Sequence, residues 1–154
     1  MATKITTIYN ALETLLGTAL TGYIKMPDPY EVADNPELFL TKGYGIAVGP
    51  GVNTNRFTGC KKSFEREFTI ILSNLVSTTE TNADQREELE KSLLEDQYKI
   101  WNAIETDADL SGNTMLTVML ADGGIEYLEI GDDNPSKYIL MEISVTAEYS
   151  EVLT

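Results

Sequence analysis

The short motif whose spacing is typical of a metal site lies in the second half of the chain. Asp107, Asp109 and Ser111 stand at positions 1, 3 and 5 of a calcium-binding loop, and Gly112 follows at position 6. The twelfth position, where such loops carry a bidentate glutamate, is Val118. An acidic loop that closes a helix is therefore the better interpretation than a cation site. We expect no metal and no cofactor.

The residue types that carry most nucleophilic and acid–base chemistry are scarce. The chain has no histidine and one cysteine, Cys60, which excludes Ser-His and Cys-His nucleophile pairs and zinc sites built from these residues. Carboxylates are plentiful, with Glu65 and Glu67 on one strand face and Asp132 and Asp133 in one turn. No pattern places such a pair in a cleft, where a raised pKa would make one of them an acid. We therefore predict that the protein is not an enzyme.

The charge of the chain is distributed unevenly. The 154 residues carry a formal net charge of −14. Residues 1–79 contain seven acidic and seven basic residues, whereas residues 80–154 contain eighteen acidic and four basic ones. Solvated surfaces alone can produce such unevenness. Alternatively, the basic patch between residues 56 and 66 favours an acidic protein partner or a second copy of this chain over nucleic acid.

Periodicity predicts the elements that must position these charges. Apolar residues at helical spacing predict helices over residues 3–22 and from 81 or 82 to 105, with Leu93, Leu94 and Trp101 on the buried stripe of the second. Alternation predicts strands over 43–48, 64–72 and 138–149, and a short strand over 23–26. Residues 114–120 and 125–130 read as two strands joined by a tight turn at 121–124.

The connection between the strands at 43–48 and 64–72 is much longer than a hairpin turn requires. Glycine, proline and asparagine are frequent from about Gly49 to Lys61, so we expect a polar, projecting arm that binds a partner. Acidic residues at 132 and 133 complement its charge. The candidate partner-binding residues are Asn53, Asn55, Arg56, Phe57, Lys61, Lys62, Arg66, Asp132 and Asp133.

The order of the elements predicts one α+β domain over residues 1–154. Hairpin-length links favour a mainly antiparallel sheet, with both helices packed on one face and a long hairpin arm projecting from it.

This layout resembles the tail-terminator proteins of long-tailed bacteriophages, the group of the lambda minor tail protein U. The likeness is carried by a first helix with Ile5, Ile8, Tyr9 and Leu12, the long hairpin, the strand Phe64-Glu-Arg-Glu-Phe68-Thr-Ile70, a second helix and the final strand over 138–149. The likeness covers nearly the whole chain. It lies in the arrangement and length of the elements, and no signature motif supports it. The arm at 49–61 departs from the group in its length.

The resemblance implies a structural virion protein at the head-proximal end of the tail. Members of the group form a hexameric ring on the last ring of the tail tube, stop its growth and present a surface to the head-completion proteins. The expected partners are therefore other copies of the chain, the tail tube protein and a head-completion or stopper protein. A strongly acidic lumen would repel the DNA backbone, so genomic DNA passes only as cargo.

The sequence leaves two alternatives to a terminator. A head-completion or stopper protein of the same neck has similar size and chemistry, and an acidic inhibitor that mimics DNA also combines small size with negative charge. The longest apolar run, at 116–121, is too short to cross a membrane. The N-terminus lacks a basic segment followed by an apolar core, so we expect synthesis in the host cytoplasm and no membrane partner.

Overall fold

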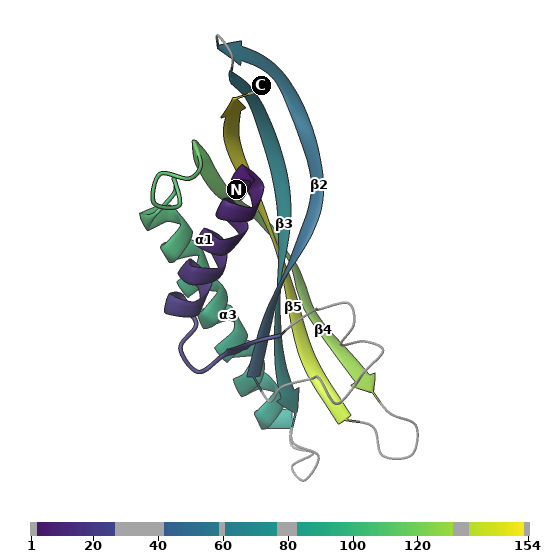
Figure 1. Ribbon diagram of the computed structural model, residues 1–154. Helices are drawn as coiled ribbons and strands as arrows, with labels where there is room; N and C mark the ends of the chain where they lie inside the picture. The colour runs from purple at the N-terminus through teal and green to yellow at the C-terminus, as the bar shows by residue number, and fades with distance from the viewer. Residues whose placement is uncertain (1–2, 27–41, 59–60, 77–82, 131–135, 153–154) are drawn as a thin grey trace.

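The computed structural model describes residues 3–26, 42–58, 61–76, 83–130 and 136–152. Figure 1 shows the elements in these ranges, which are mostly strand and include two helices. They are α1 (Lys4–Ala19), β1 (Ile24–Lys25), β2 (Lys42–Thr58), β3 (Lys61–Val76), α3 (Ala83–Thr106), β4 (Leu116–Ile130) and β5 (Ser136–Val152). The predicted α+β class is confirmed.

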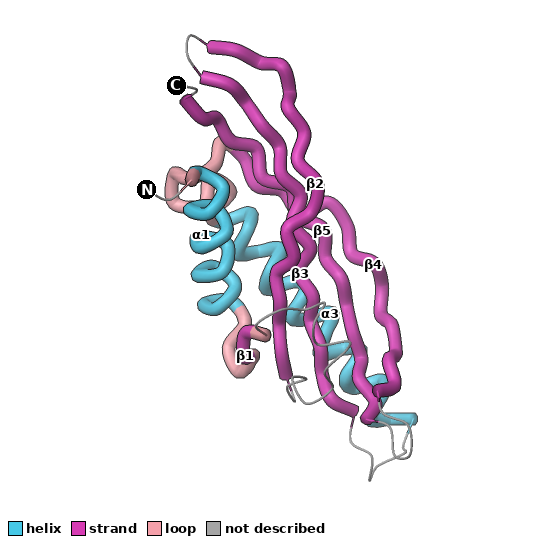
Figure 2. Tube along the Cα trace, turned by 45° about the vertical axis from the view of Figure 1, so that its right-hand side comes forward, coloured by secondary structure: helices cyan, strands magenta, loops and turns pink. Residues whose placement is uncertain are grey.

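The strands form one five-stranded sheet in the order β1-β2-β3-β5-β4. All neighbours are antiparallel except β1 and β2, which are parallel at Ile24 opposite Gly43. The two hairpins, β2–β3 and β4–β5, meet through their inner strands β3 and β5. Four of the strands have 15 to 17 residues, roughly three times the usual length of about 5–6 residues. The sheet is therefore long and narrow (Figure 2).

Helix α1 follows from local sequence signals. The Thr3 hydroxyl accepts a hydrogen bond from the Thr6 amide at 3.3 Å, which caps the first turn. Ile8, Leu12 and Leu16 recur every four residues and are buried. Past the end of the helix, Gly22 adopts φ +87°, a conformation that favours glycine and lets the chain turn into β1.

Figure 1 shows α1 and α3 on the same side of the sheet. Buried side chains of both helices belong to one apolar cluster with alternate residues of the central strands. On β3 these residues include Phe68, Ile70 and Leu72, and on β5 they include Ile143 and Val145. Because side chains alternate along a strand, the intervening residues face away from the helices.

The prediction for the buried stripe of α3 is wrong in two positions. Leu93, Ile100 and Ile104 are buried as an amphipathic helix requires, but Leu94 and Trp101 are exposed. Each of these two follows a buried residue by one position, and one residue turns the side chain by about 100° around the helix axis. The apolar residues of α3 therefore occupy two separate faces.

The predicted long connection from 49 to 61 is strand wherever the structure describes it, so the expected bounds of the two strands are wrong. Strand β2 continues to Thr58 and β3 begins at Lys61, with Thr58 opposite Lys61. Register shifts fall between Val48 and Gly51 and between Asn53 and Phe57. The glycine- and proline-rich composition therefore marks bulges, which insert extra residues into a strand without ending it.

A similar correction applies to the predicted turn at 121–124. Strand β4 is continuous from Leu116 to Ile130 and pairs with β5 along its length, with register shifts near Ala121 and between Asp122 and Ile125. Gly124 has φ +78°. An irregular strand, and not a hairpin, accounts for the two consecutive glycines.

Candidate functional site

The predicted partner-binding residues near the arm gather at one end of the β2–β3 hairpin. The backbone of residues 55–57 lies in β2, and Phe57 stands opposite Lys62. Asn53 is exposed and stands opposite Phe64, and Lys61 is exposed at the start of β3. Asp132 and Asp133 lie outside the described residues, so their predicted role is untouched by the structure.

Arg66 differs from the other basic candidates because its side chain is hydrogen-bonded to the backbone of β2. Its Nη1 donates a hydrogen bond to the Gly49 carbonyl at 3.1 Å, across the first bulge. A Cβ atom at Gly51 would lie 2.4 Å from the Arg66 Cζ atom, so glycine leaves the space that the guanidinium group occupies. The Nε atom is buried and has no hydrogen-bond partner among the described residues. The Arg66 guanidinium group therefore contacts the neighbouring strand of its own sheet.

Among the described residues, the two edges of the sheet lack a strand partner over most of their length. Strand β4 is last in the strand order, and β1 covers β2 only at Gly43 and Tyr44 within the described part of the chain. Val48 and Val52 of β2 are 55% and 58% exposed. Free edges of long strands are sites at which another chain can join, unless bulges or charges block them.

The two lateral sides of the molecule also differ in charge. We define the β2 side as β1 and β2, which together contain three basic residues and no acidic one. The α3–β4 side is defined as α3 and β4, which together contain ten acidic and three basic residues. Helix α3 contacts β4 but also β5 and β3, and its Asp96 lies 3.8 Å from Lys42 of β2, so α3 crosses the sheet and only β4 lies at the edge opposite β2. The sequence alone does not show that the basic residues of β2 and the acidic residues of β4 lie at opposite edges, which follows from the strand order.

An exposed apolar stripe runs along α3. Leu94, Tyr98 and Trp101 are 51%, 64% and 48% exposed and follow one another at i, i+4 and i+7 on one face of the helix. The rings of Tyr98 and Trp101 meet edge to face with centroids 6.4 Å apart. The Trp101 Nε1 atom donates a hydrogen bond to Glu105 at 3.2 Å. Sequence reasoning assigned two of these residues to the core and so missed the stripe.

The sheet face that points away from the helices is acidic. Glu65 and Glu67 of β3 and Glu142 and Glu148 of β5 alternate with the buried residues. Glu65 stands directly opposite Glu148 in the β3–β5 register, whereas Glu67 stands opposite Thr146. Like charges at directly opposite positions destabilise a sheet. We therefore expect the Glu65–Glu148 pair to weaken the sheet at this position.

A buried polar cluster connects α3 to the sheet. Asp96 is 3% exposed and accepts hydrogen bonds from the Tyr23 hydroxyl and from Lys99 Nζ, each at 2.7 Å. Asn74 donates to the Tyr23 hydroxyl at 3.3 Å, and Lys42 Nζ lies 3.8 Å from Asp96. Burial and the bond to Asp96 raise the pKa of Tyr23 well above its ordinary range, and the same carboxylate raises the pKa of Lys99.

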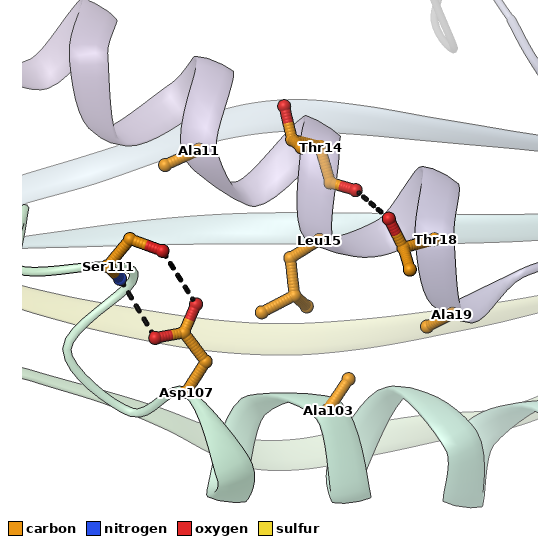
Figure 3. Close-up of a pocket in the computed structure, with 8 residues that line it drawn as sticks. All are labelled: Ala11, Thr14, Leu15, Thr18, Ala19, Ala103, Asp107 and Ser111. Carbon is orange, nitrogen blue, oxygen red and sulfur yellow. Dashed lines mark hydrogen bonds between the residues drawn. The ribbon is translucent and has the colours of Figure 1, made fainter.

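A groove of about 530 Å³ lies between the two helices (Figure 3). Its lining is mostly small, with Ala11, Thr14, Leu15, Thr18 and Ala19 from α1, and Ala103, Asp107 and Ser111 from α3 and the turn after it. The hydroxyls of both threonines donate to backbone carbonyls of α1, at 3.0 Å each.

The acidic turn at one end of the groove contains the residues of the calcium-like motif. The Asp107 carboxylate accepts hydrogen bonds from the Ser111 amide at 2.8 Å and from its hydroxyl at 3.3 Å. Ser111 and Gly112 both have positive φ. The motif thus forms the turn that follows α3, and the Asp107 carboxylate accepts its hydrogen bonds from within this turn.

Among the described residues, no group of three or more His, Cys, Asp or Glu side chains is arranged to hold a metal ion. Neither helix in the described part of the chain is long and apolar enough to cross a membrane. No protein-family model and no curated protein matches the chain.

Proposed function

We propose that this protein is a tail terminator of a long-tailed bacteriophage. In this role it forms a closed ring of identical subunits, six by the resemblance given above, on the last ring of the tail tube. The ring stops tube growth and joins the tail to the head-completion proteins. The protein performs no catalysis and needs no cofactor.

The observation that carries the proposal is the contrast between the two lateral sides. A ring requires a head-to-tail contact between two different, complementary surfaces of the same subunit. Strands β1 and β2 contain only basic charges and β4 contains only acidic ones, and the strand order places β2 and β4 at opposite edges. Opposite charges attract copies into one orientation, whereas contact between two identical sides is repulsive.

The remaining architecture fits the same role. Both helices lie on the same side of the sheet (Figure 1), and in this proposal residues 49–58 and 61–66 of the β2–β3 hairpin are the arm that binds a partner. Lys61 and Asn53 in this arm are exposed and suit contact with an acidic partner such as the next component of the neck. The acidic face, with Glu67 and Glu142, forms the lumen wall and repels the DNA that passes through.

The proposal is tested by measuring the size of the purified protein, alone and mixed with isolated tail tubes. We expect rings in electron micrographs and one ring at the head-proximal end of each tube. Because the subunit contact is between unlike charges, higher ionic strength should weaken ring formation. A compact monomer that does not bind tube ends contradicts the proposal. Binding to isolated heads instead of tubes would identify a stopper protein of the same neck.

The acidic face also supports a second candidate, an inhibitor that mimics DNA. Cross-strand carboxylates such as Glu65 and Glu148, followed by Glu67 along β3, form a patch of repeated negative charge. A mimic competes with duplex DNA for a nuclease or a repressor, and this competition is lost when the glutamates of the face are changed to glutamine. A terminator shows no such competition and keeps its affinity for tube ends.

A further inference from the structure

We propose that the exposed stripe of α3, Leu94, Tyr98 and Trp101, is the docking site for a basic amphipathic helix of a different protein. The two helices pair as in a coiled coil. Apolar residues of the partner cover the stripe, and its lysine or arginine side chains approach the glutamates beside it. The inference goes beyond the proposed ring, because it names a partner other than a second copy of this chain.

The stripe has the spacing of a coiled-coil seam. The step from Leu94 to Tyr98 is the d-to-a step of a heptad, and the step from Tyr98 to Trp101 is the a-to-d step. All three side chains are about half exposed or more. Leu93 and Ile100, at the c positions of the same heptads, are buried in the core. Helix α3 therefore has one apolar face that packs inside the protein and a second that the described residues leave uncovered.

The composition of the stripe is typical of a protein contact. Tyrosine and tryptophan are enriched among the residues that dominate the binding free energy of interfaces. The rings of Tyr98 and Trp101 already contact each other edge to face, which restricts their rotamers before a partner binds. A helix that covers them therefore loses little additional side-chain entropy on this surface.

The e positions beside the seam carry the charge that selects the partner. Glu88 and Glu95 occupy these positions, are exposed and form no ion pair with a described residue. Asp96, and to a smaller degree Glu95, raise the pKa of Lys99, but the ion pair of Lys99 is with Asp96. Charges at e and g positions set partner choice through ion pairs between helices. Glu88 and Glu95 therefore favour a partner helix with lysine or arginine beside its own seam.

Charged residues also set the length of the apolar seam. Glu87 and Lys91 continue the heptad before Leu94 and pair with each other at 2.6 Å, so they add no net charge. Glu105 occupies the next a position after Trp101 and accepts a hydrogen bond from the indole Nε1 atom. The seam is therefore apolar at its centre and negative at its C-terminal end, which suits a short helix with a basic residue opposite Glu105.

Charge excludes the helices of this chain as the partner. In a parallel pair of α3 helices, e positions face g positions, so Glu90 of one copy would approach Glu95 of the other. In an antiparallel pair, e positions face each other and again bring glutamates together. Helix α1, the other helix in the described part of the chain, contains only Lys4 and Glu13 as charged residues. The occupant is therefore a helix of another protein.

The test uses the single tryptophan of the chain as its reporter, because Trp101 lies in the proposed site. The probes are two synthetic peptides of roughly three heptads, long enough to form a helix on binding. Both have leucine at a and d, and they differ only in lysine or glutamate at e and g. Each is titrated into the full chain at low salt while the tryptophan emission is recorded.

We expect the lysine peptide to move the Trp101 emission to shorter wavelength, because its leucines remove the indole ring from water. It should bind at least ~10-fold more tightly than the glutamate peptide. The double variant Glu88→Gln, Glu95→Gln should reduce this preference, and higher ionic strength should reduce it in the wild type.

Two variants separate the apolar contact from general attraction to an acidic protein. Leu94→Gln and Tyr98→Gln each keep the net charge and the reporter but remove an apolar side chain from the seam. Each should weaken binding of the lysine peptide at least ~10-fold. Val152→Gln changes a similarly exposed residue at the end of β5 and should bind as the wild type does. Far-ultraviolet circular dichroism and thermal unfolding verify that the variants fold.

Four results overturn the inference. They are no binding of the lysine peptide, equal binding of the two peptides, binding that both seam variants leave unchanged, and binding seen by calorimetry without a change in Trp101 emission. The last two would show that the peptide is held elsewhere by the net charge of the chain. The proposed ring is tested by ring formation and binding to tube ends, so its failure is distinguishable from each of these results.

Discussion

The two faces of the central strands β3 and β5 have opposite compositions. One face contributes Phe68, Ile70 and Ile143 to the core under the helices, and the other presents Glu65 and Glu148. The strands are the same, and only the alternation of side chains separates the two faces. The apolar face provides the stability of the fold, so the composition of the acidic face is free to serve another purpose, although it includes a pair of opposed like charges.

The largest expected effect is a difference in stability between substitutions at two adjacent isoleucines, which lie on opposite faces of the sheet. Ile70→Ala removes a fully buried side chain from the core and should lower the free energy of unfolding by about 2–5 kcal/mol. Ile71→Ala, its matched control, changes a partly exposed residue opposite Glu142 and should cost less than half as much. Urea denaturation measures both. Equal losses would show that both faces contribute equally to stability.

A smaller loss of stability is expected from a substitution in the buried polar cluster, where α3 contacts the sheet. Asp96→Ala leaves the Tyr23 hydroxyl without its main acceptor and should cost about 1–3 kcal/mol. The two lysines near Asp96 are partly exposed, so water solvates them once the carboxylate is gone. Asp96→Asn keeps an oxygen acceptor for Tyr23 and should lose less. If Asn and Ala are equally harmful, the negative charge matters more than the hydrogen bond.

The same cluster predicts a loss of stability in alkali. Burial and Asp96 raise the pKa of Tyr23 in the folded chain above its ordinary value of about 10. Above that pH the unfolded chain has released a proton that the folded chain still holds, so stability falls until the pH passes the folded pKa. Lys99 acts in the same direction. Tyr23→Phe should therefore show a shallower decline in thermal unfolding temperature between pH 9 and 11 than the wild type.

The control for the alkaline prediction is Tyr98→Phe, because Tyr98 is exposed on α3, whereas the hydrogen bonds to Asp96 come from Tyr23 and Lys99. This variant should follow the wild-type curve. If Tyr23→Phe declines as steeply as the control, other groups govern the alkaline transition.

Periodicity predicted the elements whose apolar residues share one face. Helix α1, with Ile8, Leu12 and Leu16, and the alternation in β3 and β5 are confirmed because burial of one face dictates the pattern. The bulged strands were missed because Gly49 and Gly124 are typical of turns and bulges alike, and only pairing with a neighbouring strand distinguishes them.

The candidate site was predicted less completely. Lys61 is exposed as expected, but Arg66 packs on Gly51, a contact between strands that no local pattern reveals. The α3 stripe was missed because Leu94 and Trp101 directly follow the buried residues Leu93 and Ile100. The apolar residues therefore cover a wide part of the helix surface, and the pattern assigned all of them to the core. A second signal, the separation of Leu94 from Trp101 by seven residues, was available in the sequence.

The smallest expected effect concerns the acidic face alone and asks whether its charge opposes folding. Glu65→Gln removes one member of the opposed pair with Glu148 and should raise the free energy of unfolding by roughly 0.2–1 kcal/mol at low salt. Because salt screens charges on an open face, the gain should shrink at high ionic strength. Glu67→Gln, opposite Thr146, is the matched control and should change stability less. A destabilising Glu65→Gln would mean that this carboxylate supports the fold, and the acidic face would then need no separate role as a wall that repels DNA.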